Sequence, residues 1–267
     1  MDTPAVKLAS GYWIPALGLG TWDLRGEECV TAVRTPLGMG YNHIDTADMY
    51  GNQAEIGRAM AGSDRSDIFV TSKVWRDDLH YDDVVRVGEA ALRDLQTDYL
   101  DLLLIHWPNR SVPLRETFGA LEQLVAQGSV RSVGVSNFDV TLLKAAIQAT
   151  DLPLTNNQVE FHPLLRQQEL LAFCQQHDIT LTAYCPLGRG AVLRNEVIVD
   201  LAREHGKSPA QVSLRWLIQQ GTIAIPKAGS EEHMRENMAI FDFEISPDDA
   251  QVIDRIEDKH RVVALDP

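Results

Sequence analysis

Four side chains in the first half of the chain could together deliver a proton to a carbonyl oxygen. They are a carboxylate, a phenol, an ammonium and an imidazole: Asp45, Tyr50, Lys73 and His106. An ammonium within about 4 to 6 Å of a phenol lowers its pKa from about 10 toward neutrality, and a carboxylate partner offsets the cost of burying that ammonium. A neutral imidazole can donate a hydrogen bond that orients the oxygen. This set predicts Tyr50 as the acid that protonates the oxygen while a hydride reaches the carbon.

The segments around these residues predict a parallel sheet. From Tyr41 onward, short runs rich in β-branched residues alternate with amphipathic stretches, as in repeated strand–helix units. We expect eight strands, at Ala16–Gly20, Tyr41–Asp45, Ile68–Lys73, Leu100–His106, Val130–Ser136, Thr155–Glu160, Thr180–Cys185 and Thr222–Pro226. Apolar residues at steps of three and four predict helices between them. The clearest helices are Asp82–Leu95, Arg115–Gln127, Val140–Ala149, Gln167–Gln176 and Pro209–Gln220.

Eight strands with seven or eight helices predict a closed (β/α)8 barrel, a TIM barrel, rather than an open doubly wound sheet. A Gly-x-Gly-x-x-Gly fingerprint is absent, because Gly18 and Gly20 lack the third glycine, and this also disfavours a Rossmann domain. No Pro-, Gly- or Ser-rich linker divides the chain, so we expect one domain over residues 1–267. At the start, Val6 to Trp13 alternates polar and apolar residues and predicts a hairpin that caps the bottom of the barrel.

Polar side chains stand at the carboxyl ends of the predicted strands. Barrel enzymes place their catalytic groups at these ends, because the following loops converge over one mouth. The ends carry Asp45, Lys73, His106, Ser136, Asn137, Gln158, Glu160, Tyr184 and Lys227. Turn or cap preferences explain any one of them equally well. Together they predict a catalytic mouth.

Composition and charge exclude several classes of protein. The chain has 24 Lys and Arg against 38 Asp and Glu, a net charge of −14, which repels nucleic acids and anionic membranes. No segment approaches ~18 consecutive apolar residues and the start lacks a signal-peptide pattern, so we expect a cytoplasmic protein with a small-molecule partner. The cysteines, Cys29, Cys174 and Cys185, are widely spaced, which argues against disulfides and a zinc site.

Several ordered motifs resemble those of the aldo-keto reductase superfamily. They are GYNHIDTADMYGNQ at 40–53, TSKVW at 71–75, DYLDLLLIHWP at 98–108, GVSNF at 134–138, NQVEFHP at 157–163, YCPLG at 184–188, IPK at 225–227 and EN at 236–237. The match covers nearly the whole chain and is most similar to bacterial diketogluconate and methylglyoxal reductases. The resemblance implies a barrel that reduces carbonyl groups to alcohols with NAD(P)H. Because most members of the superfamily are monomers, it also implies a monomer.

Residue by residue, the resemblance implies a catalytic tetrad of Asp45, Tyr50, Lys73 and His106. It also implies that a nicotinamide ring binds through its carboxamide to Ser136, Asn137 and Gln158 and stacks on Tyr184. The other cofactor contacts that it implies are Pro186, Leu187 and Gly188 at the pyrophosphate and, along and after the Ile-Pro-Lys segment, Ile225, Lys227, Ser230, His233, Glu236 and Asn237.

One segment departs from the pattern of NADPH-preferring relatives. In those relatives a serine follows Ile-Pro-Lys, and an arginine six residues after the lysine clasps the 2′-phosphate of the adenosine. Here Ala228 and His233 stand at these positions. Losing the guanidinium removes a bidentate ligand that is always charged, although Lys227 and Ser230 remain and Arg235 is a further candidate. We therefore expect NADPH as cofactor, with NADH accepted more readily than in relatives that carry the arginine.

Three tryptophans, Trp22, Trp75 and Trp107, follow the first, third and fourth strands and predict the walls of a substrate pocket. The short loop after Pro108 and the brief tail after His260 predict that this pocket is open and shallow. Such a pocket suits small aldehydes, dicarbonyls or keto-sugar acids.

Two other functions are compatible with a barrel of this kind. One is a nicotinamide-binding subunit that regulates a partner protein, which the intact tetrad disfavours. The other is an aldolase that forms a Schiff base on Lys73. A Schiff-base lysine needs a lowered pKa and no carboxylate beside it, and Asp45 argues against that.

Overall fold

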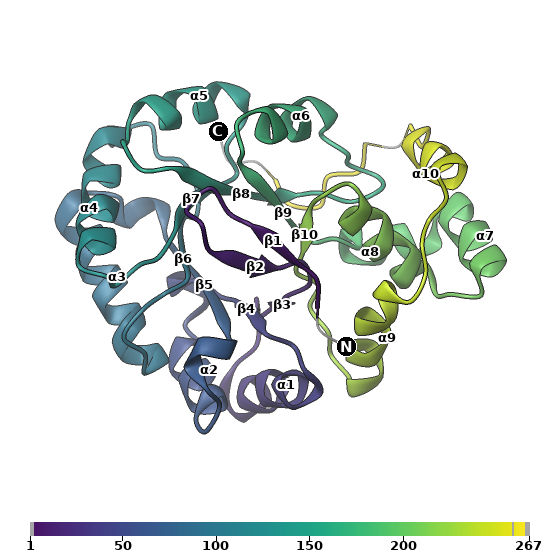
Figure 1. Ribbon diagram of the computed structural model, residues 1–267, viewed down its shortest axis with the longest axis horizontal. Helices are drawn as coiled ribbons and strands as arrows, with labels where there is room; N and C mark the ends of the chain where they lie inside the picture. The colour runs from purple at the N-terminus through teal and green to yellow at the C-terminus, as the bar shows by residue number, and fades with distance from the viewer. Residues whose placement is uncertain (1–2, 258, 265–267) are drawn as a thin grey trace.

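The centre of the molecule is a closed barrel of parallel strands. A computed structural model describes residues 3–257 and 259–264. Eight strands pair in the order β10-β9-β8-β7-β6-β5-β4-β3. The two edge strands then meet, because Leu17 bridges Ala224 in parallel and the Ala224 amide donates to the carbonyl of Ala16 at 2.9 Å. The predicted (β/α)8 barrel is confirmed, with helices around its outside (Figure 1).

Each predicted strand is present, and most are shorter than expected. The strands are β3 (Leu19–Gly20), β4 (His43–Asp45), β5 (Phe69–Val74), β6 (Leu102–Ile105), β7 (Val133–Ser136), β8 (Leu154–Glu160), β9 (Thr180–Tyr184) and β10 (Ile223–Ala224). In proportion to the expected length, the largest difference lies at the closing seam, where β3 and β10 each keep two residues of the five expected. Their ladder is a single isolated bridge, so little of that seam is continuous strand.

Ten helices surround the strands within the described part of the chain. They are α1 (Gly26–Met39), α2 (Gln53–Met60), α3 (Tyr81–Leu95), α4 (Leu114–Ala126), α5 (Val140–Gln148), α6 (Gln168–Gln176), α7 (Glu196–His205), α8 (Pro209–Gln219), α9 (Glu231–Met238) and α10 (Pro247–Asp254). The five helices expected from periodicity end within one residue of their predicted bounds, because their apolar stripes face the sheet. In α3, for example, Val84, Val87, Ala91 and Leu95 are all buried.

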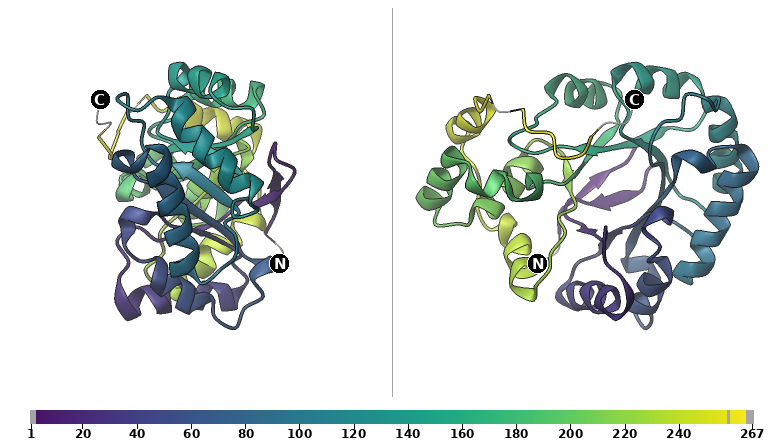
Figure 2. Two further views of the ribbon diagram at one scale, coloured as in Figure 1. Left: turned by 90° about the vertical axis from the view of Figure 1, so that its left-hand side faces the viewer. Right: turned by 180° about the vertical axis from the view of Figure 1, so that it is seen from behind.

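The predicted hairpin caps the amino-terminal end of the barrel. It consists of β1 (Ala5–Lys7) and β2 (Trp13–Pro15), which pair antiparallel. Leu8 and Ile14 form a separate apolar cluster with residues that include Phe69 and Ile223, the first residues of β5 and β10. The two views of Figure 2 place this hairpin and the C-terminal tail at opposite ends of the barrel. The strand carboxyl ends therefore open at the end that the tail crosses.

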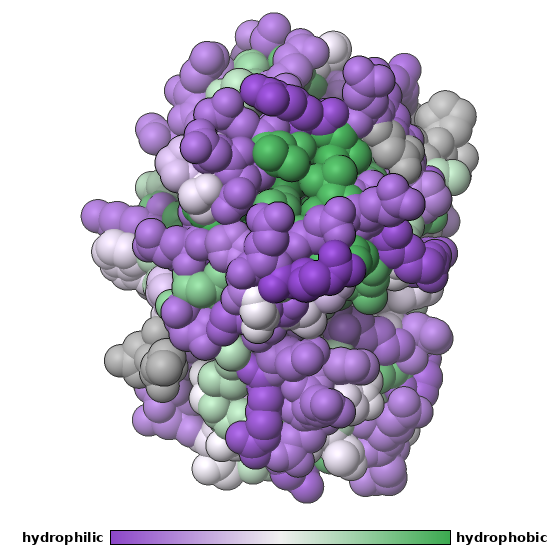
Figure 3. All heavy atoms as spheres, turned by 90° about the vertical axis from the view of Figure 1, so that its right-hand side faces the viewer, coloured by the Kyte–Doolittle hydropathy of each residue, from purple (hydrophilic) through white to green (hydrophobic). Residues whose placement is uncertain are grey.

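Polar side chains cover most of the face that carries α7 and α10, and apolar atoms gather there in one patch (Figure 3). Among residues 3–257 and 259–264, none of the helices has both the length and the apolar character needed to cross a membrane.

Candidate active site

A buried ion pair lies at the carboxyl ends of β4 and β5. The Nζ atom of Lys73 lies 2.6 Å from Oδ1 of Asp45, 2.8 Å from the carbonyl oxygen of Thr46 and 3.3 Å from the hydroxyl of Tyr50. The Lys73 side chain has no exposed surface. Burial alone would lower the pKa of Lys73, but the Asp45 carboxylate and the phenol raise it, and the net direction is upward. Lys73 is therefore an ammonium with all three of its protons donated.

The second oxygen of Asp45 also has a partner inside the barrel. Nε2 of Gln158, on β8, donates to Oδ2 of Asp45 at 2.6 Å. The carboxylate is thus held from two sides, which fixes its orientation toward Lys73. The carbonyl oxygen of the Gln158 amide accepts no hydrogen bond from a described residue, so it remains available to a ligand at the mouth.

The loop after β4 brings Tyr50 to the ammonium. Tyr50 ends a 3-10 turn, Asp48–Tyr50, and Gly51 follows with a φ of 60°, a left-handed conformation that glycine adopts without strain. Asn52, which is fully buried, then fastens the loop: Nδ2 donates to the carbonyl of Thr21 at 3.0 Å, and Oδ1 accepts from the Thr46 hydroxyl at 2.8 Å. Asn52 therefore ties the end of the loop that carries Tyr50 to Thr46 at its start and to Thr21 after β3.

The expected lowering of the Tyr50 pKa was wrong in its net direction. Burial raises the pKa of Tyr50, Lys73 lowers it and Asp45 raises it again, and burial has the largest effect. The phenol is 9% exposed, so its charged form loses most of its hydration. Tyr50 is thus protonated at neutral pH, and the nearby ammonium is a charge that would stabilise the phenolate if the proton were lost.

His106 faces the same space from the end of β6. Its ring lies edge-to-face against Tyr50, with centroids 5.6 Å apart, and against Trp75 at 5.2 Å. Burial, and then the positive charge of Lys73, hold the pKa of His106 well below its usual value, so the imidazole is neutral. Its Nδ1 is buried without a hydrogen-bond partner among the described residues, which leaves Nε2 as the nitrogen able to meet a ligand.

The predicted tryptophans lie around these residues. Trp22 is 46% exposed and its ring packs edge-to-face on Tyr50 at 4.9 Å. Trp75 contacts His106 as described above, and Trp107 lines a cavity beside the mouth. Trp22 and Trp75 therefore flank the phenol and the imidazole, whereas Trp107 lines a cavity that none of these four side chains reaches.

The residues expected to hold the nicotinamide carboxamide lie next to His106. Nδ2 of Asn137 donates to the His106 carbonyl at 3.0 Å, and Oδ1 of Asn137 accepts from the Tyr184 hydroxyl at 2.7 Å. The Ser136 hydroxyl donates to the carbonyl of Gln158 at 2.7 Å. Asn137 has a φ of 63°, in the left-handed region, which turns the chain at the end of β7.

The chemistry of this donor set fits a nicotinamide ring. Asn137 and Ser136 supply polar groups for an amide, the free amide oxygen of Gln158 supplies an acceptor, and Tyr184 supplies a half-buried aromatic face. Both amide hydrogens of Asn137 already have partners, the His106 carbonyl and the Ser136 hydroxyl, so a ligand would exchange one of these bonds.

Three of the other predicted cofactor residues lie together in the turn after β9. They are Pro186, Leu187 and Gly188; Gly188 has a φ of 54°, and its amide donates to the carbonyl of Cys185 at 2.8 Å. Ile225 is buried in the same apolar cluster as Leu8 and Ile14, and Tyr184 packs against that cluster.

The remaining residues lie on and before α9. Lys227 and His233 are exposed, whereas Asn237 is buried and Glu236 half-buried. Ser230 caps α9, because its hydroxyl accepts from the His233 amide at 3.2 Å. Arg235, the further candidate for a phosphate ligand, is paired with Glu231 in the first turn of the same helix.

Sequence reasoning left the role of Glu160 open, although the residue stood among the predicted strand ends. Glu160 is fully buried at the end of β8, and its two oxygens accept from the amides of Val262 and Val263, both at 2.8 Å. It also lies 3.0 Å from Nε2 of His162. Burial would raise the pKa of Glu160, but these hydrogen bonds hold it below its usual value. A buried carboxylate thus anchors the C-terminal tail over the mouth.

Fold and site define a barrel enzyme, with ionisable side chains gathered at the strand carboxyl ends. A model of the Aldo/keto reductase family matches residues 16–258. Glyoxal reductase of Bacillus subtilis (strain 168) is 42% identical over 260 residues, 96% of this chain and 94% of that protein. The chain belongs to the aldo/keto reductase family and is an oxidoreductase.

Solved structures agree with this assignment. An aldo-keto reductase from a Medee basin deep-sea metagenome library superposes with a TM-score of 0.93 at 36% identity, covering 97% of each chain. A crystal structure of an aldo-keto reductase complexed with NADPH has a TM-score of 0.93 at 31% identity and covers 98% of this chain and 90% of that one.

The buried histidines give a pH-dependent prediction. Burial lowers the pKa of His43, on β4, to about 4, and the pKa of His106 is lowered in the same direction. In the unfolded chain both titrate near the ordinary value of about 6.5. The unfolded chain therefore binds more protons below that pH, so the free energy of unfolding falls as the pH drops from about 6.5 toward 4.

NMR of the imidazole 15N chemical shifts against pH measures the protonation state of both rings directly. Both rings are expected to stay neutral in the folded chain from pH 8 to about 5 and to titrate near pH 6.5 in urea. A folded-state titration of His106 with a midpoint near 6.5 would show that the imidazole is not buried as described.

Proposed function

We propose that the chain is a nicotinamide-dependent reductase that converts aldehydes, dicarbonyls or keto-sugar acids to alcohols, with Tyr50 as general acid. The observation that carries the proposal is the contact of one buried ammonium, Lys73, with both Asp45 and the Tyr50 hydroxyl. The names of two similar proteins support it, since one is a glyoxal reductase and another was crystallised with NADPH.

Each residue of the tetrad has a distinct task in this reaction. A reduced nicotinamide, held by Ser136, Asn137, Gln158 and Tyr184, would supply the hydride for the carbonyl carbon. The Tyr50 hydroxyl donates its proton to the carbonyl oxygen, and Lys73 stabilises the phenolate that remains. Asp45 keeps Lys73 charged and in place, while His106 donates a hydrogen bond to the same oxygen. The oxygen is thereby held between the phenol and the imidazole.

The geometry weighs against the aldolase alternative. A Schiff-base lysine attacks as a neutral amine, which requires a lowered pKa. The pKa of Lys73 is raised, and all three of its protons are donated to neighbouring oxygens. No observation favours a purely regulatory role, because the tetrad side chains are in contact.

The cofactor proposal follows from the segment around α9. We expect NADPH as the cofactor with NADH also accepted, because His233 replaces the arginine and Arg235 is already paired with Glu231. Lys227 is exposed and remains as a single charge for a 2′-phosphate. The monomeric and cytoplasmic state expected from the sequence stays a prediction.

Replacing the acid tests the central role. Tyr50→Phe is expected to lower the reduction of methylglyoxal by at least about 100-fold, because a positioned acid contributes roughly 10²- to 10⁴-fold. Binding of NADPH, followed by its fluorescence, should stay close to that of the parent, since the hydroxyl acts in the transition state. Tyr12→Phe, on the exposed hairpin, is the matched control. Retention of more than about a tenth of the parent turnover by Tyr50→Phe contradicts the assignment.

Cofactor selectivity is tested by kcat/KM with each reduced nicotinamide. The parent is expected to prefer NADPH by less than about 100-fold, and His233→Arg should raise that preference about tenfold or more through the KM for NADPH. Glu232→Gln, which changes the charge of the same helical turn by the same amount, should have a smaller effect. A parent preference of several thousandfold for NADPH argues against the proposal.

A further inference from the structure

Glu160 is a buried carboxylate that the proposed reaction does not use. It ends β8 without any exposed surface, and it forms no ion pair with a Lys or Arg among residues 3–257 and 259–264. Its oxygens accept instead from the amides of Val262 and Val263, both at 2.8 Å, and from Nε2 of His162 at 3.0 Å. Because a buried carboxylate is costly without such partners, the charge of Glu160 and the position of the tail depend on each other.

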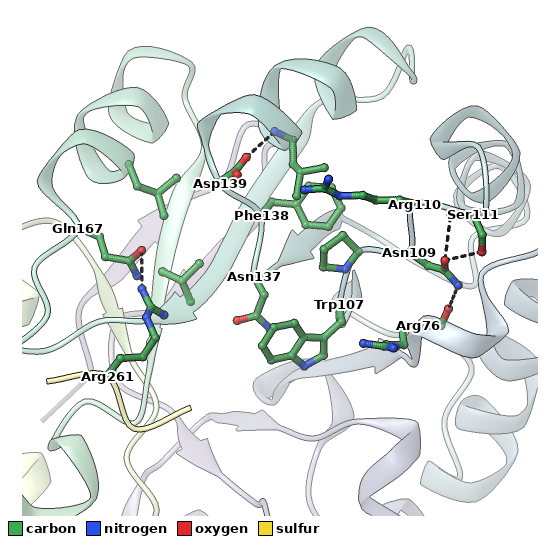
Figure 4. A pocket seen from close by; sticks show the side chains of 14 residues that line it. Arg76, Trp107, Asn109, Arg110, Ser111, Asn137, Phe138, Asp139, Gln167 and Arg261 are labelled. Carbon is green, nitrogen blue, oxygen red and sulfur yellow. Dashed lines mark hydrogen bonds between the residues drawn. The ribbon is translucent and has the colours of Figure 1, made fainter. Parts of the chain in front are cut away.

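Two of the three backbone hydrogen bonds that hold the tail, residues 259–264, end on this one carboxylate. The third runs from the His260 amide to the carbonyl of Leu164 at 3.0 Å. Arg261 adds a side-chain contact, because its Nη2 donates to Oε1 of Gln167 at 3.4 Å, as the dashed line in Figure 4 shows. The carboxylate is therefore the main anchor of the described tail.

The anchor lies beside Tyr184, the residue proposed to stack on the nicotinamide. Glu160 and Tyr184 are partners in the register of β8 with β9. Burial raises the pKa of Tyr184, the Glu160 carboxylate raises it further, and the positive charge of Arg261 lowers it. The charges of the anchor and of the tail therefore both act at the predicted nicotinamide face.

His162 connects the anchor to the turn after β9, the predicted pyrophosphate contact. A Cβ atom at Gly188 would lie 3.4 Å from Cε1 of His162 and 3.5 Å from Nε2, so the turn packs directly on the buried imidazole. Nε2 is also the nitrogen that contacts Glu160, and Nδ1 has no partner among the described residues. In a close-packed interior, a shift of the turn therefore disturbs the imidazole and, through it, the anchor.

We infer that Glu160 is a positioning residue for the cofactor, acting through the tail and through His162. Contact of a nicotinamide dinucleotide with Tyr184 and Gly188 fixes the two elements that adjoin the anchor, and so favours the closed tail. The inference rests on the proposed function, from which it takes these two contacts. Coupling of this kind is reciprocal: a ligand that favours the closed tail is bound more tightly when the tail is closed.

Exchange of the two anchored tail amides tests this coupling without measuring turnover. The amides of Val262 and Val263 are followed by hydrogen–deuterium exchange with NMR detection, with and without saturating NADPH. Bound NADPH is expected to slow their exchange by about fivefold or more, since couplings between sites commonly amount to roughly 5- to 150-fold. A carboxylate that served the fold alone would leave this exchange insensitive to the cofactor.

Glu160→Gln removes the anchor with almost no change in shape. The glutamine amide has one oxygen that accepts and one NH2 group that only donates, so one of the two tail amides then faces a second donor. Both tail amides are expected to exchange nearly as fast as in an unfolded peptide. The Kd for NADPH, measured by its fluorescence, should rise by about the factor by which NADPH slowed the exchange in the parent.

Two further variants separate the anchor from the fold. Val263→Pro removes one donor and keeps the carboxylate, because proline has no amide hydrogen, and it should raise the Kd for NADPH by about threefold or more. This variant decides the question if Glu160→Gln does not fold. Glu122→Gln, on α4, is the matched control, since that carboxylate accepts from the Asp151 amide at 3.2 Å. It should leave the Kd within about twofold.

The other outcomes decide against the inference or against the proposed function. NADPH that binds without slowing exchange of the tail amides overturns the inference and leaves the proposed function standing. So does a folded Glu160→Gln variant whose tail amides stay protected, or whose tail opens while its Kd for NADPH stays that of the parent. Failure of the parent to bind either reduced nicotinamide overturns the proposed function and the inference with it.

Discussion

The site depends on one constraint: an ammonium without any exposed surface must have all its protons accepted. Lys73 meets this constraint with a carboxylate, a backbone carbonyl and a phenol, from Asp45, Thr46 and Tyr50. A buried charge that loses its partner costs several kcal/mol, so these groups are held together by the cost of separating them. The phenol is the only one of the three that can give up a proton to a ligand. The same constraint therefore stabilises the structure and holds the phenol in position.

The barrel supplies these partners from strands that are distant in sequence. Parallel pairing of β4 with β5 places Asp45 beside the strand that carries Lys73, and closure of the barrel lets Gln158 on β8 reach the other carboxylate oxygen. Asn137 and Tyr184, at the ends of β7 and β9, complete a ring of polar groups around the mouth. Glu160 then ties the tail across this ring through the amides of Val262 and Val263.

Much of the fold and of the candidate site could be predicted from residue types and from the residues at the strand ends. The barrel, its hairpin and the proximity of Asp45, Lys73 and Tyr50 follow from alternating segments and from the need to pair a buried lysine. The sign of the Tyr50 pKa shift could not be predicted, because it depends on how completely the phenol is buried. The sequence pattern also overestimated the length of six of the eight strands, and in proportion most of all the two at the seam. The two tail amides that bind Glu160 lie more than 100 residues away in the sequence, and no local pattern predicts such a contact.

The most direct test of the account is the rate of carbonyl reduction by the double variant Lys73→Met/Asp45→Asn. This variant removes both charges together, so it leaves no unpaired charge in the barrel, and its fold can be checked by circular dichroism. If the ammonium stabilises the phenolate that Tyr50 becomes on losing its proton, kcat should fall by about 100-fold or more while NADPH still binds. A folded double variant that reduces the aldehyde within about tenfold of the parent rate would show that the ion pair is structural and that Tyr50 does not depend on it.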